Sequence, residues 1–290
     1  MGSTAMNVAR SRAAESRRAD RLFDDPFARE FVLAASPEPA EPPGDTARQP
    51  SAGEAVNLAS VLDEYVPIRT RFFDDYLRDA GEAGCRQVAL LAAGLDTRAF
   101  RLVWPEGVRL FELDLPDVFA FKERVLASRH ATPACQRHVV PVDLRGDWPA
   151  ALLDAGFRPD RATVWLLEGI LMYLAEDERS AVLKRVGGLS ISGSRLALEP
   201  PGWTIPASLL PSLARGVIDQ SALTQLRALT EAAQSDPSVR DPLAWLAGHG
   251  WKGRLHGAKE QFASYGRSLP PLVEVMLGAA PRWLATAERS

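Results

Sequence analysis

The chain has 290 residues, 46% of them hydrophobic and 24% charged, so it is long enough to bury a large single core. Its 34 basic and 37 acidic side chains give a formal net charge of −3, which favours neither nucleic acid nor an anionic membrane as a partner. Two cysteines, Cys85 and Cys135, are too few for a disulfide scaffold, and the four histidines lack close metal-ligand spacing, so we expect reduced thiols, no metal and a cytoplasmic location.

The first 80 residues predict a helical cap that contains a long loop. Residues 5–35 favour two helical pieces that are broken near Asp24, Asp25 and Pro26. Residues 36–54 are rich in proline, glycine and charge, which predicts either a mobile surface loop or a lid that orders over a ligand. A helix is expected from Asn57 to Asp79, and Pro67 could break it. No apolar run is long enough for a signal peptide or a membrane span.

Strands and helices then alternate along the chain. Five short apolar or β-branched runs predict strands at Gln87–Leu91, Val108–Leu113, His138–Val142, Thr163–Glu168 and Arg195–Glu199. Helices are expected between them at Pro116–Ser128, Trp148–Ala155 and Ala175–Leu189. This alternation predicts right-handed βαβ units, and hence a doubly wound, Rossmann-like parallel sheet of the α/β class.

The alternation of strands and helices stops in residues 202–250. Apolar helices are predicted there at Pro206–Arg215 and Ser221–Ala233, and two further strands follow at Lys252–His256 and Arg282–Thr286. We expect one domain over residues 1–290: a cap (1–80), a cofactor-binding core (81–200), a helical insertion that covers the substrate (201–250) and the final strands (251–290).

A glycine and an acid follow the first two predicted strands. Gly94 comes just after the first strand, and Asp114, 20 residues later, ends the second, where a carboxylate can accept hydrogen bonds from ribose hydroxyls. This pair fits both a nicotinamide and an S-adenosylmethionine site. The dinucleotide pattern GxGxxG is poorly matched, because Ala92 and Thr97 stand at the first and third glycine positions. The residues therefore favour a cofactor without phosphates.

The third strand is followed by Asp143 and Leu144, which could meet the amine and the ring of an adenine. The structural alternative is that Asp143 or Asp147 simply caps the helix that starts at Trp148.

The fourth strand ends at Glu168, a carboxylate on a very apolar strand that needs a partner. That partner could be a ligand ammonium group or an arginine, Arg69 or Arg98. Arg69 itself is either a carboxylate-binding side chain or an exposed helix arginine.

Seven segments, in order, resemble the leucine carboxyl methyltransferase-like family of S-adenosylmethionine-dependent methyltransferases, and more closely its bacterial O-methyltransferase branch, some of whose members act on polyketides. These segments are ARSRAAESRRADRLFDDPFAREFV, IRTRFFDDYL, ALLAAGLDTRAFRL, FELDLPDVFAFK, VPVDLRGDWPAAL, LLEGILMYL and the YGR of residues 265–267. The resemblance covers nearly the whole chain and implies a class I methyltransferase sheet.

The resemblance also implies a role for each matched residue. Arg69 would bind the cofactor carboxylate, Asp114 the ribose and Glu168 the methionyl end. In the glycine turn, Gly94 matches the second glycine of the family's GAG, and Ala92 replaces the first. The adenine side would be formed by the matched pair Asp143 and Leu144.

The sequence thus predicts an O-methyltransferase that uses S-adenosylmethionine, releases S-adenosylhomocysteine and methylates a carboxylate or hydroxyl of a small, polyketide-like or aromatic metabolite, as in secondary metabolism. No general base stands out, and only weak catalytic candidates remain: Tyr173, His249 and His256. The alternatives are a nicotinamide-dependent oxidoreductase and a non-catalytic relative that binds S-adenosylmethionine. A serine hydrolase is excluded, because no GxSxG elbow is present.

Overall fold

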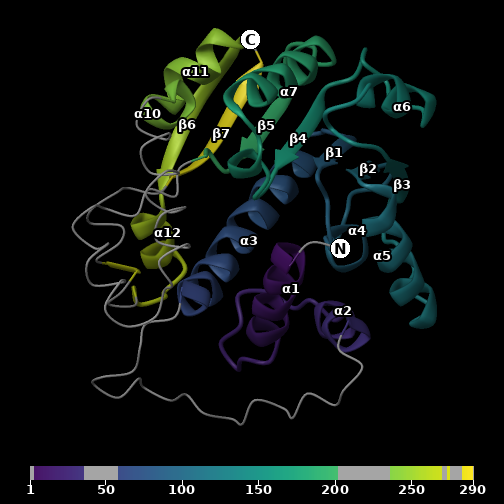
Figure 1. The fold of residues 1–290 in the computed structure, drawn as a ribbon, viewed down its shortest axis with the longest axis vertical. Helices are drawn as coiled ribbons and strands as arrows, with labels where there is room; N and C mark the ends of the chain where they lie inside the picture. The colour runs from purple at the N-terminus through teal and green to yellow at the C-terminus, as the bar shows by residue number, and fades with distance from the viewer. Residues whose placement is uncertain (1–2, 36–57, 202–235, 270–272, 275–282, 290) are drawn as a thin grey trace.

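The computed structural model describes residues 3–35, 58–201, 236–269, 273–274 and 283–289. Within these residues a central sheet carries helices on both faces (Figure 1). No helix in this described part is long and apolar enough to cross a membrane. The predicted loop or lid at 36–54 and the predicted helices Pro206–Arg215 and Ser221–Ala233 lie outside the described residues.

The sheet has seven strands in the order β3-β2-β1-β4-β5-β7-β6. Strands β1 to β5 are parallel, and β7 runs antiparallel to both β5 and β6. The strands are β1 (Gln87–Leu91), β2 (Arg109–Asp114), β3 (Gln136–Pro141), β4 (Thr163–Leu167), β5 (Arg195–Leu198), β6 (Trp251–Gly257) and β7 (Trp283–Arg289). Each overlaps a predicted strand, so the doubly wound α/β class is confirmed. The chain order reverses between β1 and β4, where such sheets bind ligands.

Three helices between the strands match the prediction to within one residue at each end: α5 (Pro116–Ser128), α6 (Trp148–Asp154) and α7 (Glu176–Gly188). Two short helices, α4 (Arg98–Arg101) and η1 (Leu171–Tyr173), were not predicted. The remaining helices are α1 (Ser3–Ser16), α2 (Ala28–Ala35), α3 (Leu58–Glu82), α10 (Pro237–Arg240), α11 (Pro242–Gly248) and α12 (Ala258–Ser264).

Pro67 does not break α3, which continues through it. A proline inside a helix removes one backbone hydrogen bond and crowds the preceding turn. Here the neighbouring side chains Tyr65, Val66 and Ile68 are all buried. Because this face of α3 packs against the sheet, tertiary contacts offset the local cost of the proline.

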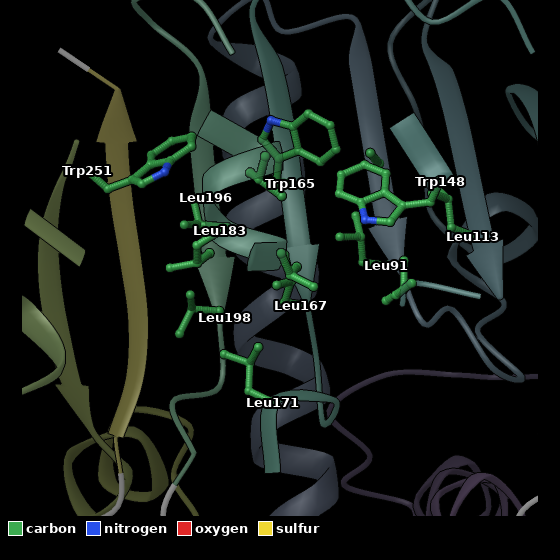
Figure 2. Close-up of a cluster of buried hydrophobic side chains, with 14 of the residues drawn as sticks. Leu91, Leu113, Trp148, Trp165, Leu167, Leu171, Leu183, Leu196, Leu198 and Trp251 are labelled. Carbon is green, nitrogen blue, oxygen red and sulfur yellow. The ribbon is translucent and has the colours of Figure 1, made fainter. Parts of the chain in front are cut away.

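Two hydrophobic layers hold the sheet between its helices. One face packs against α3 and α12 and is rich in phenylalanine and leucine. The other face packs against α6, α7 and α11. Figure 2 shows part of this second layer, in which side chains of β1, β2, β4, β5 and β6 pack with residues of α6, η1 and α7: Leu91, Leu113, Trp148, Trp165, Leu167, Leu171, Leu183, Leu196, Leu198 and Trp251. These layers fix the strand ends, and with them the side chains that follow the strands.

The N-terminal cap lies at the carboxyl ends of the parallel strands. Arg12 of α1 donates from Nη2 to the carbonyl of Leu95, 2.6 Å away, just after the glycine turn. From the other side, Arg267 of the YGR segment donates to Glu15 of α1 across 2.7 Å. The predicted break near Asp25 is confirmed, because α1 ends at Ser16 and α2 begins only at Ala28, whose backbone N–H donates to Asp25 Oδ1.

One part of the predicted insertion lies away from the binding edge. α11 ends at Gly248, directly before β6 begins at Trp251, and it packs beside β6 at the opposite end of the molecule from α1 (Figure 1). Because β6 runs in the same direction as the parallel strands, its first residue stands at their amino edge. The expectation that residues 236–250 help to close the binding edge is therefore wrong for α11. For residues 202–235 the substrate lid stays a prediction.

Candidate functional site

The site is built from the segments that follow the parallel strands at their carboxyl ends. The turn after β1 carries Gly94, β2 ends at Asp114, and Glu168 follows β4. Because β1 lies between β2 and β4 in the sheet, these three segments meet at one edge. The structure thus brings together the acid and glycine positions that the sequence placed far apart.

The turn after β1 adopts a conformation that favours glycine. Gly94 has φ of 51°, and Ala92 has φ of 55°, so the alanine adopts the left-handed backbone that glycine favours. The turn is tied to β2, because the N–H of Gly94 donates to Asp114 Oδ2 across 2.6 Å. A Cβ on Gly94 would lie 3.9 Å from the Cβ of Ala5 in α1. The cap therefore lies directly over this turn.

Asp114 is held by backbone groups. In addition to Gly94, the N–H of Leu115 donates to its Oδ1 across 2.7 Å. Burial raises the pKa of Asp114 above its ordinary value, although both backbone hydrogen bonds act to lower it. The next residue, Leu115, is 45% exposed, which provides an apolar surface beside the carboxylate.

Arg69 reaches the site from α3 and is buried. Its Nε donates to Glu168 Oε1 across 2.9 Å, and its Nη1 donates to Glu199 Oε2 across 2.7 Å. Tyr65, one helical turn earlier, donates to the other oxygen of Glu199. The carboxylates outweigh the opposing effect of burial and raise the pKa of Arg69, so it stays charged. The interpretation of Arg69 as an exposed helix arginine is wrong.

Gly169 lets this pair form. It follows Glu168 with φ of 69°, and a Cβ there would lie 3.3 Å from Arg69 Nη1. A side chain at this position would crowd the guanidinium. The glycine after the glutamate is thus explained by the close approach of the arginine.

Glu168 is shared by two arginines. Its Oε2 accepts from Arg98 Nη1 across 2.8 Å, so both arginines that the sequence offered as partners are engaged. The side chain of Glu168 is still 14% exposed, whereas that of Arg98 is 1% exposed. Arg98 is therefore too buried to contact an acceptor directly.

Asp143 and Leu144, which the sequence predicted to meet an adenine, lie in two different environments. Asp143 is half-exposed, and its Oδ1 accepts from the N–H of Arg145 across 2.9 Å. Leu144 is buried in the core instead of facing the site. The alternative helix cap is provided by Asp147, whose side chain accepts from Ala150 at the start of α6.

Of the three weak catalytic candidates, Tyr173 is the one on the segment that follows β4, five residues after Glu168 in the chain. It is 52% exposed in η1, and its hydroxyl donates to Thr4 Oγ1 of α1 across 3.1 Å. His249 stands at the amino end of β6, at the opposite edge, with Nδ1 2.8 Å from the carbonyl of Trp245. His256 is the second-last residue of β6, at the same edge as Glu168, but β7 and β5 separate β6 from β4, and His256 packs against Phe72.

Glu199 and Leu115 were not predicted as site residues from the sequence. Glu199 follows β5 as Glu168 follows β4, so the signal was an acid at the end of an apolar strand. The signal for Leu115 was an apolar residue just after Asp114. Within the described residues, no cluster of three or more His, Cys, Asp or Glu side chains could hold a metal ion.

Comparisons with known proteins show the family of the chain. Residues 5–187 match the family described as leucine carboxyl methyltransferase. A protein of Parafrankia sp. named for S-adenosyl-L-methionine-dependent methyltransferase activity is 46% identical over 88% of this chain and 77% of its own length. A protein of Frankia alni named for the same activity is 44% identical over 97% and 95%. The crystal structure of a DUF574 family protein from Streptomyces avermitilis shares the fold, with a TM-score of 0.52 and 16% identity over 97% of both chains.

Proposed function

The chain belongs to the leucine carboxyl methyltransferase family and is an S-adenosylmethionine-dependent methyltransferase, and we propose that it methylates an oxygen of a small molecule. The observation that carries this proposal is the buried Arg69–Glu168 pair beside Asp114 at the point where the strand order reverses. This arrangement offers a positive and a negative group to the two charged ends of the cofactor's amino acid. A nicotinamide dinucleotide offers no such pair of charges.

In this proposal each side chain has one task. Arg69 donates to the cofactor carboxylate, Glu168 accepts from its ammonium group, and Asp114 accepts from the ribose hydroxyls. Charge-assisted hydrogen bonds of this kind contribute about 1.5–3 kcal/mol each. Asp143 accepts from the adenine amine, and the exposed Leu115 takes the place of the buried Leu144 against the ring.

The acceptor is proposed to be a carboxylate. The cofactor supplies a methyl group that its sulfonium has already activated, so the protein must hold the acceptor oxygen in line and exclude water. A phenol or alcohol must lose a proton, which requires a base, whereas a carboxylate does not. His249 and His256 lie on strands away from β4 or at the opposite edge of the sheet, and in this proposal the exposed Tyr173 orients the acceptor. A hydroxyl acceptor is the second candidate.

The finer points of function belong to the same proposal. We propose that the acceptor is a polyketide-like or aromatic metabolite and that the protein acts in secondary metabolism in the cytoplasm. We also propose that residues 202–235 form the substrate lid. These follow from the bacterial branch that the sequence resembles and from the apolar character of the segment.

The test is methyl transfer from labelled S-adenosylmethionine to matched pairs of aromatic and aliphatic acceptors. Each pair contains a free acid and the corresponding phenol or alcohol. We expect the label in base-labile esters of the acids. Label in base-stable ethers would move the proposal to a hydroxyl acceptor, and label on nitrogen or carbon alone would contradict O-methylation.

A further inference from the structure

Arg98 is a buried cation at the centre of the site. Its side chain is 1% exposed, yet it touches three carboxylates from three different segments. Nε donates to Asp74 of α3 across 2.7 Å, and Nη1 donates to Asp96 of the glycine turn and to Glu168 after β4. Asp96 also accepts from the backbone N–H of Arg98, which fixes the start of α4. The guanidinium therefore joins the cap helix, the glycine turn and β4.

This contact determines how Glu168 meets Arg69. Arginine and carboxylate groups tend to pair through two parallel hydrogen bonds. Here only Oε1 of Glu168 faces Arg69, because Oε2 is held by Arg98. As a result, Nη2 of Arg69 donates to no residue in the described part of the chain. That nitrogen remains available for a carboxylate from outside.

We propose that Arg98 is a positioning residue, which holds Glu168 toward the cofactor's ammonium group and keeps Arg69 available for its carboxylate. The inference rests on the proposed roles of Glu168 and Arg69. Without the Arg98 contact, the Glu168 carboxylate can rotate to accept two hydrogen bonds from Arg69. Both charged groups of the site are then paired with each other and are not available to the cofactor. The cofactor then loses contacts to its amino acid but none to its nucleoside.

Arg101 provides a matched control. It lies one turn further along α4, is buried like Arg98 and donates to both oxygens of Asp74. Within the described residues Arg101 makes no hydrogen bond to Glu168 or Asp96, and its partners there are Asp74 and the ring of Phe23. Lysine at either position keeps the charge and removes the guanidinium fork. The two variants therefore share the cost of burial and differ in the contact to Glu168.

The test compares two ligands by calorimetry in full-length protein. S-adenosylhomocysteine carries the amino acid, and methylthioadenosine is the same nucleoside thioether without it. We expect Arg98→Lys to lower the affinity for S-adenosylhomocysteine about tenfold or more and the affinity for methylthioadenosine less than about twofold. Arg101→Lys should change both affinities alike. Thermal unfolding of the three proteins checks that the comparison is made on folded chains.

Three outcomes decide the matter. The positioning role is wrong if Arg98→Lys weakens both ligands equally, or neither, or if Arg101→Lys shows the same selectivity. Glu168→Gln tests the underlying site separately, because it should weaken S-adenosylhomocysteine selectively whether or not Arg98 positions it. If Glu168→Gln has no effect, the proposed cofactor site fails first; if it has an effect and Arg98→Lys does not, only the positioning role fails. Should Arg98→Lys not fold, Asp96→Asn, which removes one anchor of Arg98, replaces it with the same expectation.

Discussion

Two buried ion networks lie beside the strands of the sheet: a closed network around Glu112 and an open network around Glu168. Their ion pairs are similar, but the exposure of the two glutamates differs. In the first, Glu112 of β2 accepts from Lys122 across 2.6 Å and from Arg137 across 2.8 Å, and its side chain is fully buried. In the second, Glu168 accepts from Arg69 and Arg98 at similar distances, and its side chain is 14% exposed. Each glutamate thus meets two cations, but only Glu168 has room for a third.

The difference comes from their place along the strand. Glu112 lies inside β2 beneath α5, so helix and sheet enclose it. Glu168 stands one residue beyond β4, where the backbone turns away through Gly169. A buried charge therefore does not mark a site by itself. A buried ion network becomes a binding site where it lies at the end of a strand and its carboxylate remains partly exposed to a ligand.

The largest effect is expected from Glu112→Gln. This change leaves Lys122 and Arg137 buried without their shared anion, which typically costs about 3–5 kcal/mol of folding free energy. The affinity for S-adenosylhomocysteine should stay within about twofold, because the open network is untouched. Urea unfolding and calorimetry measure the two quantities. A large loss of affinity at unchanged stability would show that the two networks are not separate.

Glu168→Gln should reverse that pattern. We expect S-adenosylhomocysteine to bind about 10- to 100-fold more weakly, because one charge-assisted contact is lost. The loss of unfolding free energy should be smaller than for Glu112→Gln, since Glu199, Asp74 and Asp96 still neutralise the two arginines. The same pair of measurements applies, and equal destabilisation by both variants would remove the distinction.

The raised pKa of Asp114 predicts that stability and cofactor affinity depend on pH, with an effect of intermediate size. Because burial raises its pKa above 3.8, the folded chain holds this proton more tightly than the unfolded chain does. The ionised form therefore opposes folding above that pKa, and the cost disappears as the pH falls through it. Ribose hydroxyls donate to the ionised form, so the affinity for S-adenosylhomocysteine should fall by up to about tenfold per pH unit below the same midpoint. Asp114→Asn should bind weakly at every pH and lack this decrease.

The smallest effects are expected from the two histidines. His249→Ala removes a ring at the opposite edge of the sheet, so we expect neither affinity nor methyl transfer to change by more than about twofold. His256→Ala, against Phe72, should lower stability more than activity. Initial rates with the best acceptor check both. A rate loss above tenfold in either variant would return that histidine to the list of catalytic candidates.

The sequence predicted the sheet well because its strands are short apolar runs between turn residues, and this pattern does not depend on distant contacts. It also placed Gly94, Asp114 and Glu168 at strand ends, which lie at one edge in any parallel sheet. It could not predict which way an arginine points. Arginines in helices are usually exposed, and Arg69 and Arg98 are buried only because α3 and α4 pack against the sheet. Leu144 was assigned to the site for the opposite reason: its neighbours in the chain suggested a ligand, and its neighbours in space are the core.

The central claim is that the open network and Asp114 together bind S-adenosylmethionine. The most direct measurement is a calorimetric titration of the protein with S-adenosylhomocysteine, with NAD as the comparison ligand. We predict micromolar binding of S-adenosylhomocysteine, which is lost in Asp114→Ala and in Arg69→Ala, and no binding of NAD. Binding that survives both substitutions, or binding of NAD alone, would contradict the site described for this chain.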